Sequence, residues 1–137
     1  MTLYLDTSHL VKLYVDEEGS GELQARVGSA QVVATSSFAY AETRATFARR
    51  RSEALMTAAE CTAAIRQFDA DWPRLLVIQF DADLTIAAGR LADRHGIRGA
   101  DAVHLASFER LLSTAGDDDV EFSGADERLN RAAKNLG

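Results

Sequence analysis

The stretch LYLDTSHLVKLY, residues 3–14, decides the fold. Its first part, residues 3–6, is an apolar run that ends in an aspartate, which is typical of a short buried strand. Thr7 or Ser8 can then cap a helix whose apolar side chains lie within residues 10–14. A buried strand that passes directly into a capped helix predicts a parallel sheet, provided that strands and helices keep alternating along the chain.

This alternation continues to the end of the chain. Further strands are expected at about residues 31–36, 75–78 and 120–122. Helices are expected at about residues 23–27, 37–51, 57–73, 83–95, 100–112 and 126–135. The pattern predicts an α/β fold in three layers (α/β/α), with helices on both faces of a short central parallel sheet. Nothing marks a domain boundary, so one domain over residues 1–137 is expected.

The composition limits the kinds of function. The 137 residues carry a formal net charge of −6, which disfavours a generic nucleic-acid binder because phosphate binding favours basic proteins. A nuclease that uses divalent cations escapes this objection, since its acidic side chains gather around ions that then meet the phosphate. The single cysteine, Cys61, a start without a secretory signal and the lack of a long apolar stretch predict a cytoplasmic protein that does not cross a membrane.

Two aspartates follow predicted strands, at the sheet edge where ligands of parallel sheets bind. Asp6 ends the first strand, and Asp126 comes shortly after the last. Each could instead be a helix N-cap. The aspartates at 117–119 are expected in a solvated loop, although Asp119 could be a spare ligand.

Glu42 lies within the long helix expected from residue 37. Phe38, Ala41 and Ala45 form an apolar stripe on this helix at helical spacing. Glu42 shares this stripe or its edge, and a buried carboxylate requires a cation, a proton or hydrogen bonds. The alternative is an ion pair with a neighbouring arginine, such as Arg44.

Asp101 stands at the amino end of another apolar face. Leu105, Phe108 and Leu112 follow it on the same side of the helix. N-capping is again the alternative. His104 could join Asp101 as a second metal ligand, but a packed, hydrogen-bonded core histidine is the favoured interpretation.

The candidate ligands are oxygen atoms, with little histidine and no cysteine among them. Such a set suits Mg²⁺ or Mn²⁺ rather than zinc. Zinc-finger, P-loop, GxGxxG and GxSxG signatures are absent from the sequence. The residues alone therefore favour a site for a hard divalent cation at the carboxyl edge of the sheet.

Four segments resemble the motifs of PIN-domain proteins, in particular the VapC-type toxins, in that family's order and over nearly the whole chain. They are LDTSHLVKLYVDEEGS (5–20), SSFAYAETRATFARR (36–50), GIRGADAVHLAS (96–107) and SGADERLNRAA (123–133). The first and third are the more specific. By this resemblance the family's four acidic positions fall on Asp6, Glu42, Asp101 and Asp126, and a hydroxyl pair falls on Thr7 and Ser8. The chain departs from the pattern at Gly124, where the family usually has a threonine or serine, so the fourth position is the least secure.

The resemblance implies an Mg²⁺- or Mn²⁺-dependent endoribonuclease, the toxin of a type II toxin–antitoxin pair, that cuts tRNA or rRNA with a metal-activated water. All four acids would be catalytic, with Asp6, Glu42 and Asp101 as the metal ligands. It further implies a homodimer and a VapB-like antitoxin whose C-terminal segment enters the acidic groove. RNA would be held by basic side chains, for which the candidates are Arg44, Arg49, Arg50, Arg51, Arg94 and Arg98. For most of these arginines, a solvated helix face is the alternative.

Three other interpretations remain open. One is a PIN nuclease of RNA processing that is not a toxin, and a second is a binding module that keeps the fold without the chemistry. A third is a hydrolase or phosphatase that uses Asp6 as its nucleophile. The third is disfavoured because such motifs more often carry a second aspartate at the place of Ser8.

Overall fold

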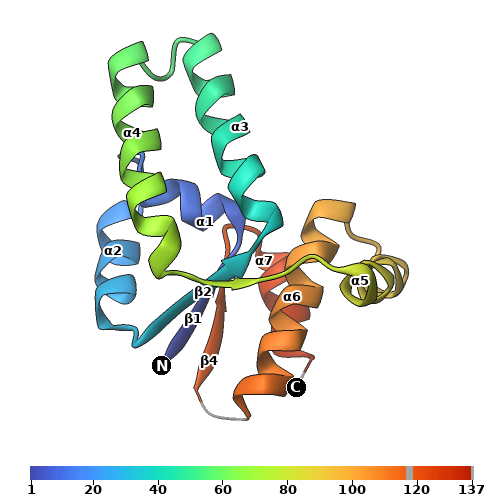
Figure 1. Cartoon of the computed structure of the whole chain (residues 1–137). Coiled ribbons are helices and arrows are strands. Elements are labelled where there is room, and N and C mark those ends of the chain that lie inside the picture. The colour runs from blue at the N-terminus through green and yellow to red at the C-terminus, as the bar shows by residue number, and fades with distance from the viewer. Residues whose placement is uncertain (117–118, 137) are drawn as a thin grey trace.

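The structure is a computed structural model and describes residues 1–116 and 119–136. Within these residues the strands are β1 (Thr2–Leu5), β2 (Val32–Ser36), β3 (Leu76–Ile78) and β4 (Val120–Ser123). The helices are α1 (Thr7–Lys12), α2 (Ser20–Ser29), α3 (Phe38–Ser52), α4 (Ala58–Asp71), α5 (Ala82–His95), α6 (Gly99–Ala115) and α7 (Glu127–Lys134), and a 3₁₀ turn, η1 (Trp72–Arg74), precedes β3. The predicted alternation of strands and helices is confirmed (Figure 1).

The strands form one parallel sheet in the order β3-β2-β1-β4. Since the sheet is parallel, the carboxyl ends of its strands share one edge, which is where Asp6 follows β1. The backbone N–H of Asp6 donates to the carbonyl of Ser123, the last residue of β4, at 3.1 Å. The start of α1 and the end of β4 are thereby fixed side by side.

Helices cover both faces of the sheet, as predicted. Side chains of β1 alternate between the faces: Leu3 and Leu5 pack in a core with α1 to α4, and Tyr4 packs in a second core with α5 to α7. Figure 1 shows α2, α3 and α4 on one side of the sheet and α5 and α6 on the other. The fold therefore has three layers, and no helix among the described residues is long and apolar enough to span a membrane.

Two local expectations are wrong. Neither Thr7 nor Ser8 caps α1, because the carboxylate of Asp6 does so by accepting from the backbone N–H of His9 at 3.1 Å. Ser8 lies two residues after the N-cap, within the first turn of α1, and donates its hydroxyl hydrogen to the same carboxylate at 2.6 Å. Asp6 is thus the N-cap that the sequence offered as its alternative role.

The inward face of α3 also differs from the predicted stripe. Its buried residues are Ala39, Thr43 and Phe47, whereas Ala41 and Ala45 are exposed. The helix is turned so that Phe47 packs against Phe68 of α4, with ring centroids 6.2 Å apart. Burying a phenyl ring removes far more apolar surface from water than burying an alanine methyl, so the aromatic contact sets the helix phase.

Candidate active site

Three of the predicted acids line one pocket at the carboxyl edge of the sheet. Asp6 comes from the end of β1, Glu42 from α3 and Asp101 from the first turn of α6. The pocket has a volume of about 450 Å³. Because α3 and α6 cover opposite faces of the sheet, the pocket lies where the two helical layers meet across its edge.

Asp6 is buried, with 5% of its surface exposed. Its Oδ1 accepts the backbone N–H of His9 and the hydroxyl of Ser8. Ser8 in turn accepts the backbone N–H of Ala125 at 3.0 Å, which ties the carboxylate to the turn after β4. Its Oδ2 accepts no hydrogen bond from the described residues, so capping leaves one oxygen free for another partner.

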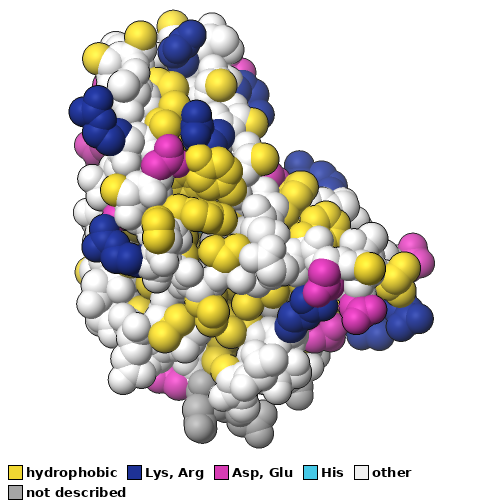
Figure 2. All heavy atoms as spheres, viewed as in Figure 1, with side chains coloured by type: hydrophobic (Ala, Val, Ile, Leu, Met, Phe, Trp, Pro, Cys, Tyr) yellow, Lys and Arg dark blue, Asp and Glu magenta, His cyan; other side chains and the backbone are white. Residues whose placement is uncertain are grey.

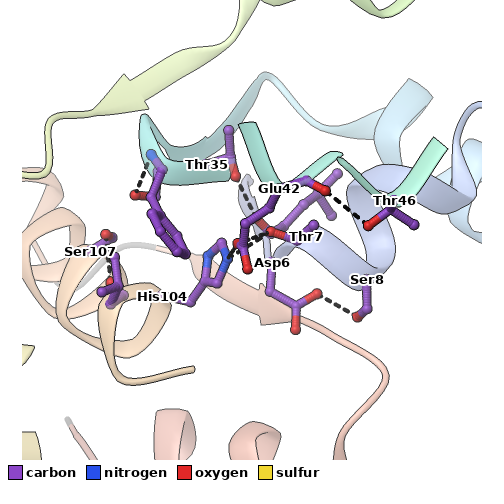
Figure 3. Close-up of polar contacts among 12 residues, drawn as sticks. Asp6, Thr7, Ser8, Thr35, Glu42, Thr46, His104 and Ser107 are labelled. Atoms are coloured by element: carbon purple, nitrogen blue, oxygen red, sulfur yellow. Dashed lines mark hydrogen bonds and ion pairs between the residues drawn. The ribbon is translucent and has the colours of Figure 1, made fainter. Parts of the chain in front are cut away.

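Glu42 is held through one of its two carboxylate oxygens. Its Oε1 accepts from the hydroxyl of Thr7 and lies 3.0 Å from Nε2 of His104. In Figure 3 the His104 ring and Thr7 lie against the Glu42 carboxylate. One quarter of the Glu42 side chain is exposed, which places it at the edge of the buried face of α3.

His104 is the packed, hydrogen-bonded core histidine that was favoured. Its Nδ1 lies 2.8 Å from the hydroxyl of Tyr4, and its Nε2 lies 2.9 Å from the hydroxyl of Thr7. Burial raises the pKa of Tyr4 well above its ordinary value, and the charges of Asp6 and Glu42 add to this. The sequence could have indicated the contact between Tyr4 and His104. Strand alternation buries Tyr4, and a buried phenol usually has a hydrogen-bond partner.

Asp101 does not cap its helix, because the N-cap of α6 is Arg98. The Arg98 guanidinium instead donates from Nε to Asp101 Oδ2 at 3.3 Å. Only 18% of the Asp101 side chain is exposed, whereas 85% of the Arg98 side chain is exposed. Asp101 therefore stays in the pocket lining with a solvent-exposed cation as its partner.

The structure does not bring Asp126 into this pocket. Its side chain is exposed and caps α7 by accepting the backbone N–H of Arg128 at 2.8 Å. Its role as the fourth acid stays a prediction. Asp119 precedes β4 at the opposite edge of the sheet, where its carbonyl accepts from Thr2 at 2.9 Å, so the spare-ligand expectation is wrong. Residues 117–118 of the same predicted loop lie outside the described residues.

Gly124, the departure from the family pattern, lies against Asp6. A Cβ atom at position 124 would lie 2.8 Å from Asp6 Cγ and would overlap the carboxylate. The carboxylate is short and is held by its capping hydrogen bonds, so it has little freedom to move aside. With Asp6 in this position, only glycine fits at 124.

Four cations line the pocket with the acids. Three were among the predicted arginines, and the set is Lys12, Arg49, Arg50 and Arg98. Arg44 faces elsewhere, since its guanidinium lies 3.7 Å from Asp69 and donates to the hydroxyl of Tyr40 at 2.8 Å. Arg51 and Arg94 are not in the pocket lining. Lys12 was missed, although it lies one helical turn after Ser8.

The donor atoms suit a hard divalent cation. Besides Asp6 Oδ2, Glu42 Oε2 and Asp101 Oδ1 accept no hydrogen bond from the described residues, so each acid keeps one free oxygen. Carboxylate oxygens are what Mg²⁺ and Mn²⁺ prefer. As placed, however, no three His, Cys, Asp or Glu side chains in the described part of the chain lie close enough together to hold one ion. Direct binding of one cation by all three acids would therefore require them to move closer together, whereas a cation held by one or two of them could complete its shell with water.

Comparisons with known proteins agree with this architecture. Residues 3–134 match the PIN domain family. Ribonuclease VapC45 and ribonuclease VapC49, from two strains of Mycobacterium tuberculosis, are each 33% identical over 135 residues, covering 98% of this chain and 91% of the relative.

Two solved structures share the fold. FitAcB from Neisseria gonorrhoeae aligns with a TM-score of 0.66 at 19% identity, over 96% of this chain and 93% of that one. VapBC2 from Rickettsia felis, bound to a DNA fragment from their promoter, aligns with a TM-score of 0.57 at 16% identity, over 90% of this chain and 100% of that one. The family match and the relatives together cover nearly the whole sequence, and the chain therefore belongs to the PIN-domain family.

Proposed function

We propose that this chain is a divalent-metal-dependent endoribonuclease of the VapC type, the toxin of a cytoplasmic toxin–antitoxin pair, with tRNA or rRNA as its substrate. One observation carries the proposal: three of the predicted acids, from three parts of the chain, line a single pocket together with Glu17 and four cations. Acids suit a cation, and the cations suit the phosphates of an RNA chain. The names of the 33% identical relatives support the same activity.

The residues divide the work as follows. Asp6 and Asp101 would hold an Mg²⁺ or Mn²⁺ ion, with Glu42 as a third ligand, directly or through water. When bound, such an ion lowers the pKa of a water molecule and stabilises the negative charge that develops on the phosphate. Lys12 and Arg49 would bind neighbouring phosphates by charge-assisted hydrogen bonds and so orient the scissile bond.

Partners follow from charge and exposed surface. A chain of net charge −6 suits a basic inhibitory segment, as expected of a VapB-like antitoxin. The face in Figure 2 carries many apolar side chains, and Leu76, Phe80 and Ile86 are exposed in the structure. Exposed apolar surface of this kind is typical of association sites, and it supports the proposed homodimer.

The first experiment incubates the purified chain with total tRNA and with rRNA, in Mg²⁺, in Mn²⁺ and in EDTA. Wild type is compared with Asp6→Asn, which keeps a side chain able to cap α1 but removes the charge. Asp93→Asn is the matched control, because Asp93 is an exposed aspartate of α5 outside the pocket. We expect discrete fragments with wild type and the control, and none with Asp6→Asn or in EDTA.

Cleavage that persists in EDTA, or that Asp6→Asn retains in full, would contradict the proposed chemistry. The toxin assignment has a separate test, which is the expression of wild type and Asp6→Asn in growing cells. Growth arrest by wild type alone supports a toxin. Metal-dependent cleavage in vitro without growth arrest would instead favour a nuclease of RNA processing.

A further inference from the structure

A buried polar network lies beneath the candidate site. It runs from Tyr4 on β1 to His104 on α6, and from there to Thr7 on α1 and Glu42 on α3. Tyr4 is fully buried, and only 3% of the His104 side chain is exposed. Four elements from both helical layers and the sheet therefore meet through one imidazole ring, and Figure 3 shows its side towards Thr7 and Glu42.

The donors fix where the proton of this ring lies. A tyrosine phenol keeps its proton at neutral pH, and among the described residues its hydrogen-bond partner is Nδ1 of His104, at 2.8 Å. The Tyr4 hydroxyl can donate to Nδ1 only when that nitrogen carries no hydrogen, so this contact is matched by a ring with its hydrogen on Nε2. The Glu42 carboxylate, which can only accept, lies 3.0 Å from Nε2 and favours the same placement of the ring hydrogen.

Both donors that reach Glu42 act on the same oxygen. His104 Nε2 and the Thr7 hydroxyl are each bonded to Oε1. Two donors on one oxygen hold the plane of the carboxylate, and Oε2 is left without a hydrogen bond from the described residues. An apolar side chain in place of His104 would leave Tyr4 without its partner and Glu42 with Thr7 alone.

We propose that His104 is a positioning residue, which Tyr4 holds in its Nε2–H form so that Glu42 presents Oε2 to a divalent cation. The identity of the cation rests on the proposed function, whereas the role of His104 goes beyond it. Hydrogen-bond partners of metal ligands typically change metal affinity by ~10–100-fold when they are removed. The inference thus predicts an effect on cation binding itself, before any RNA is added.

The experiment titrates Mn²⁺ alone into the full chain by calorimetry. His104→Leu removes the donor, whereas His104→Gln keeps an N–H group that reaches about as far as Nε2. His95→Gln is the matched control, since His95 lies at the end of α5 outside the pocket. We expect Mn²⁺ affinity to fall ~10–100-fold in His104→Leu, to be largely kept in His104→Gln and to be unchanged in His95→Gln.

A second measurement is the ¹H–¹⁵N spectrum of the histidine rings at neutral pH, without metal. The chain has three histidines, so the His104 signals are assigned by their loss in His104→Gln. We expect the ring hydrogen on Nε2 in wild type and a mixture of the two tautomers in Tyr4→Phe, with weaker Mn²⁺ binding. This variant keeps the ring and stands in for His104→Leu if that protein does not fold.

Two results would overturn the role of His104. One is wild-type Mn²⁺ affinity in folded His104→Leu or in Tyr4→Phe, and the other is the Nδ1–H tautomer of His104 in wild type. Failure of the proposed function looks different, because wild type itself would then not bind Mn²⁺. That outcome would remove the metal site and the positioning role together, whereas unaffected variants of a metal-binding wild type would remove only the positioning role.

Discussion

At the scale of single residues, the geometry of Asp6 makes helix capping compatible with its proposed role as a metal ligand. From the sequence these two roles were alternatives, yet they use different oxygens. Oδ1 caps α1, and Oδ2 accepts no hydrogen bond from the described residues. Capping by Oδ1 fixes the direction of a carboxylate that would otherwise rotate. The cap therefore contributes to the order of the site as well as to the start of the helix.

Gly124→Ala tests how tightly Asp6 is held. The new Cβ atom overlaps the Asp6 carboxylate, so that side chain must rotate away from its cap. We expect the free energy of unfolding to fall by ~1–3 kcal/mol, as in other overpacked sites. Metal-dependent cleavage should fall by ~10–100-fold, because displacing a catalytic group by about 1 Å lowers the reaction rate by up to about that factor. Urea denaturation and the cleavage assay measure the two effects.

The control for this prediction is Gly21→Ala in α2. A Cβ atom at Gly21 meets nothing within 4 Å, and alanine is favoured over glycine in a helix by up to ~1 kcal/mol. This variant should be as stable as wild type or more so, with unchanged cleavage. If Gly124→Ala behaves like Gly21→Ala, the contact with Asp6 is not a constraint on the site.

At the scale of elements, the position of the Asp126 side chain is fixed by its hydrogen bonds to the first turn of α7, which it caps. Asp126→Asn keeps an N-capping side chain, whereas Asp126→Ala removes the cap and should cost ~1 kcal/mol of stability. Because Asp126 is exposed and lies outside the pocket lining, we expect Asp126→Asn to lose less cleavage activity than Asp6→Asn. Parallel measurements of unfolding and cleavage separate the two roles. Equal losses in Asp126→Asn and Asp6→Asn would make Asp126 a member of the site in a conformation other than the one seen.

Asp81 joins α5 to α6 and gives stability a defined dependence on pH. It caps α5, and its two oxygens lie 2.9 Å from the guanidinium nitrogens of Arg110. The Arg110 hydrogen bonds, with the Leu84 backbone bond, lower the pKa of Asp81 to about 2. The pKa of Asp81 is lower in the folded chain than in the unfolded chain, where it is about 4. The ionised carboxylate therefore stabilises the fold fully at pH values above about 4. This contribution is lost as the pH falls towards 2.

Asp81→Asn keeps the cap and removes the charge. Wild type should therefore be more stable than the variant at neutral pH, and the difference should shrink between about pH 4 and pH 2. Urea denaturation of both proteins at a series of pH values measures it. A difference that stays constant over this range would show that the charge of Asp81 is not what stabilises the contact.

Element positions could be predicted from the sequence more fully than helix phases. Each strand and helix was expected near its observed place, because strand runs such as residues 3–6 and helix ends are marked by local residues. The phase of α3 was not predicted, since it depends on Phe47 meeting Phe68 across the α3–α4 contact. A hydrogen-bonded core histidine was expected at His104, but its partners were not predicted for the same reason, since Tyr4 and His104 are 100 residues apart.

At the scale of the whole molecule, the candidate ligands join its layers. Glu42 belongs to the layer that packs on Leu3 and Leu5, and Asp101 belongs to the helix that packs on Tyr4. Asp6 stands at the sheet edge between them. A bound cation would therefore link both layers to the sheet, and unfolding would have to break that link.

Cation binding should therefore stabilise the entire fold. A ligand that binds only the folded state adds about 2.7 kcal/mol at a concentration one hundred times its Kd. For a chain of this size, that corresponds to a rise in Tm of roughly 10 °C. We expect this rise with Mn²⁺ for wild type and Asp93→Asn, its reversal by EDTA, and little of it in Asp6→Asn. An equal rise in the Tm of Asp6→Asn would mean that the cation binds elsewhere. The pocket at the sheet edge would then not be the metal site.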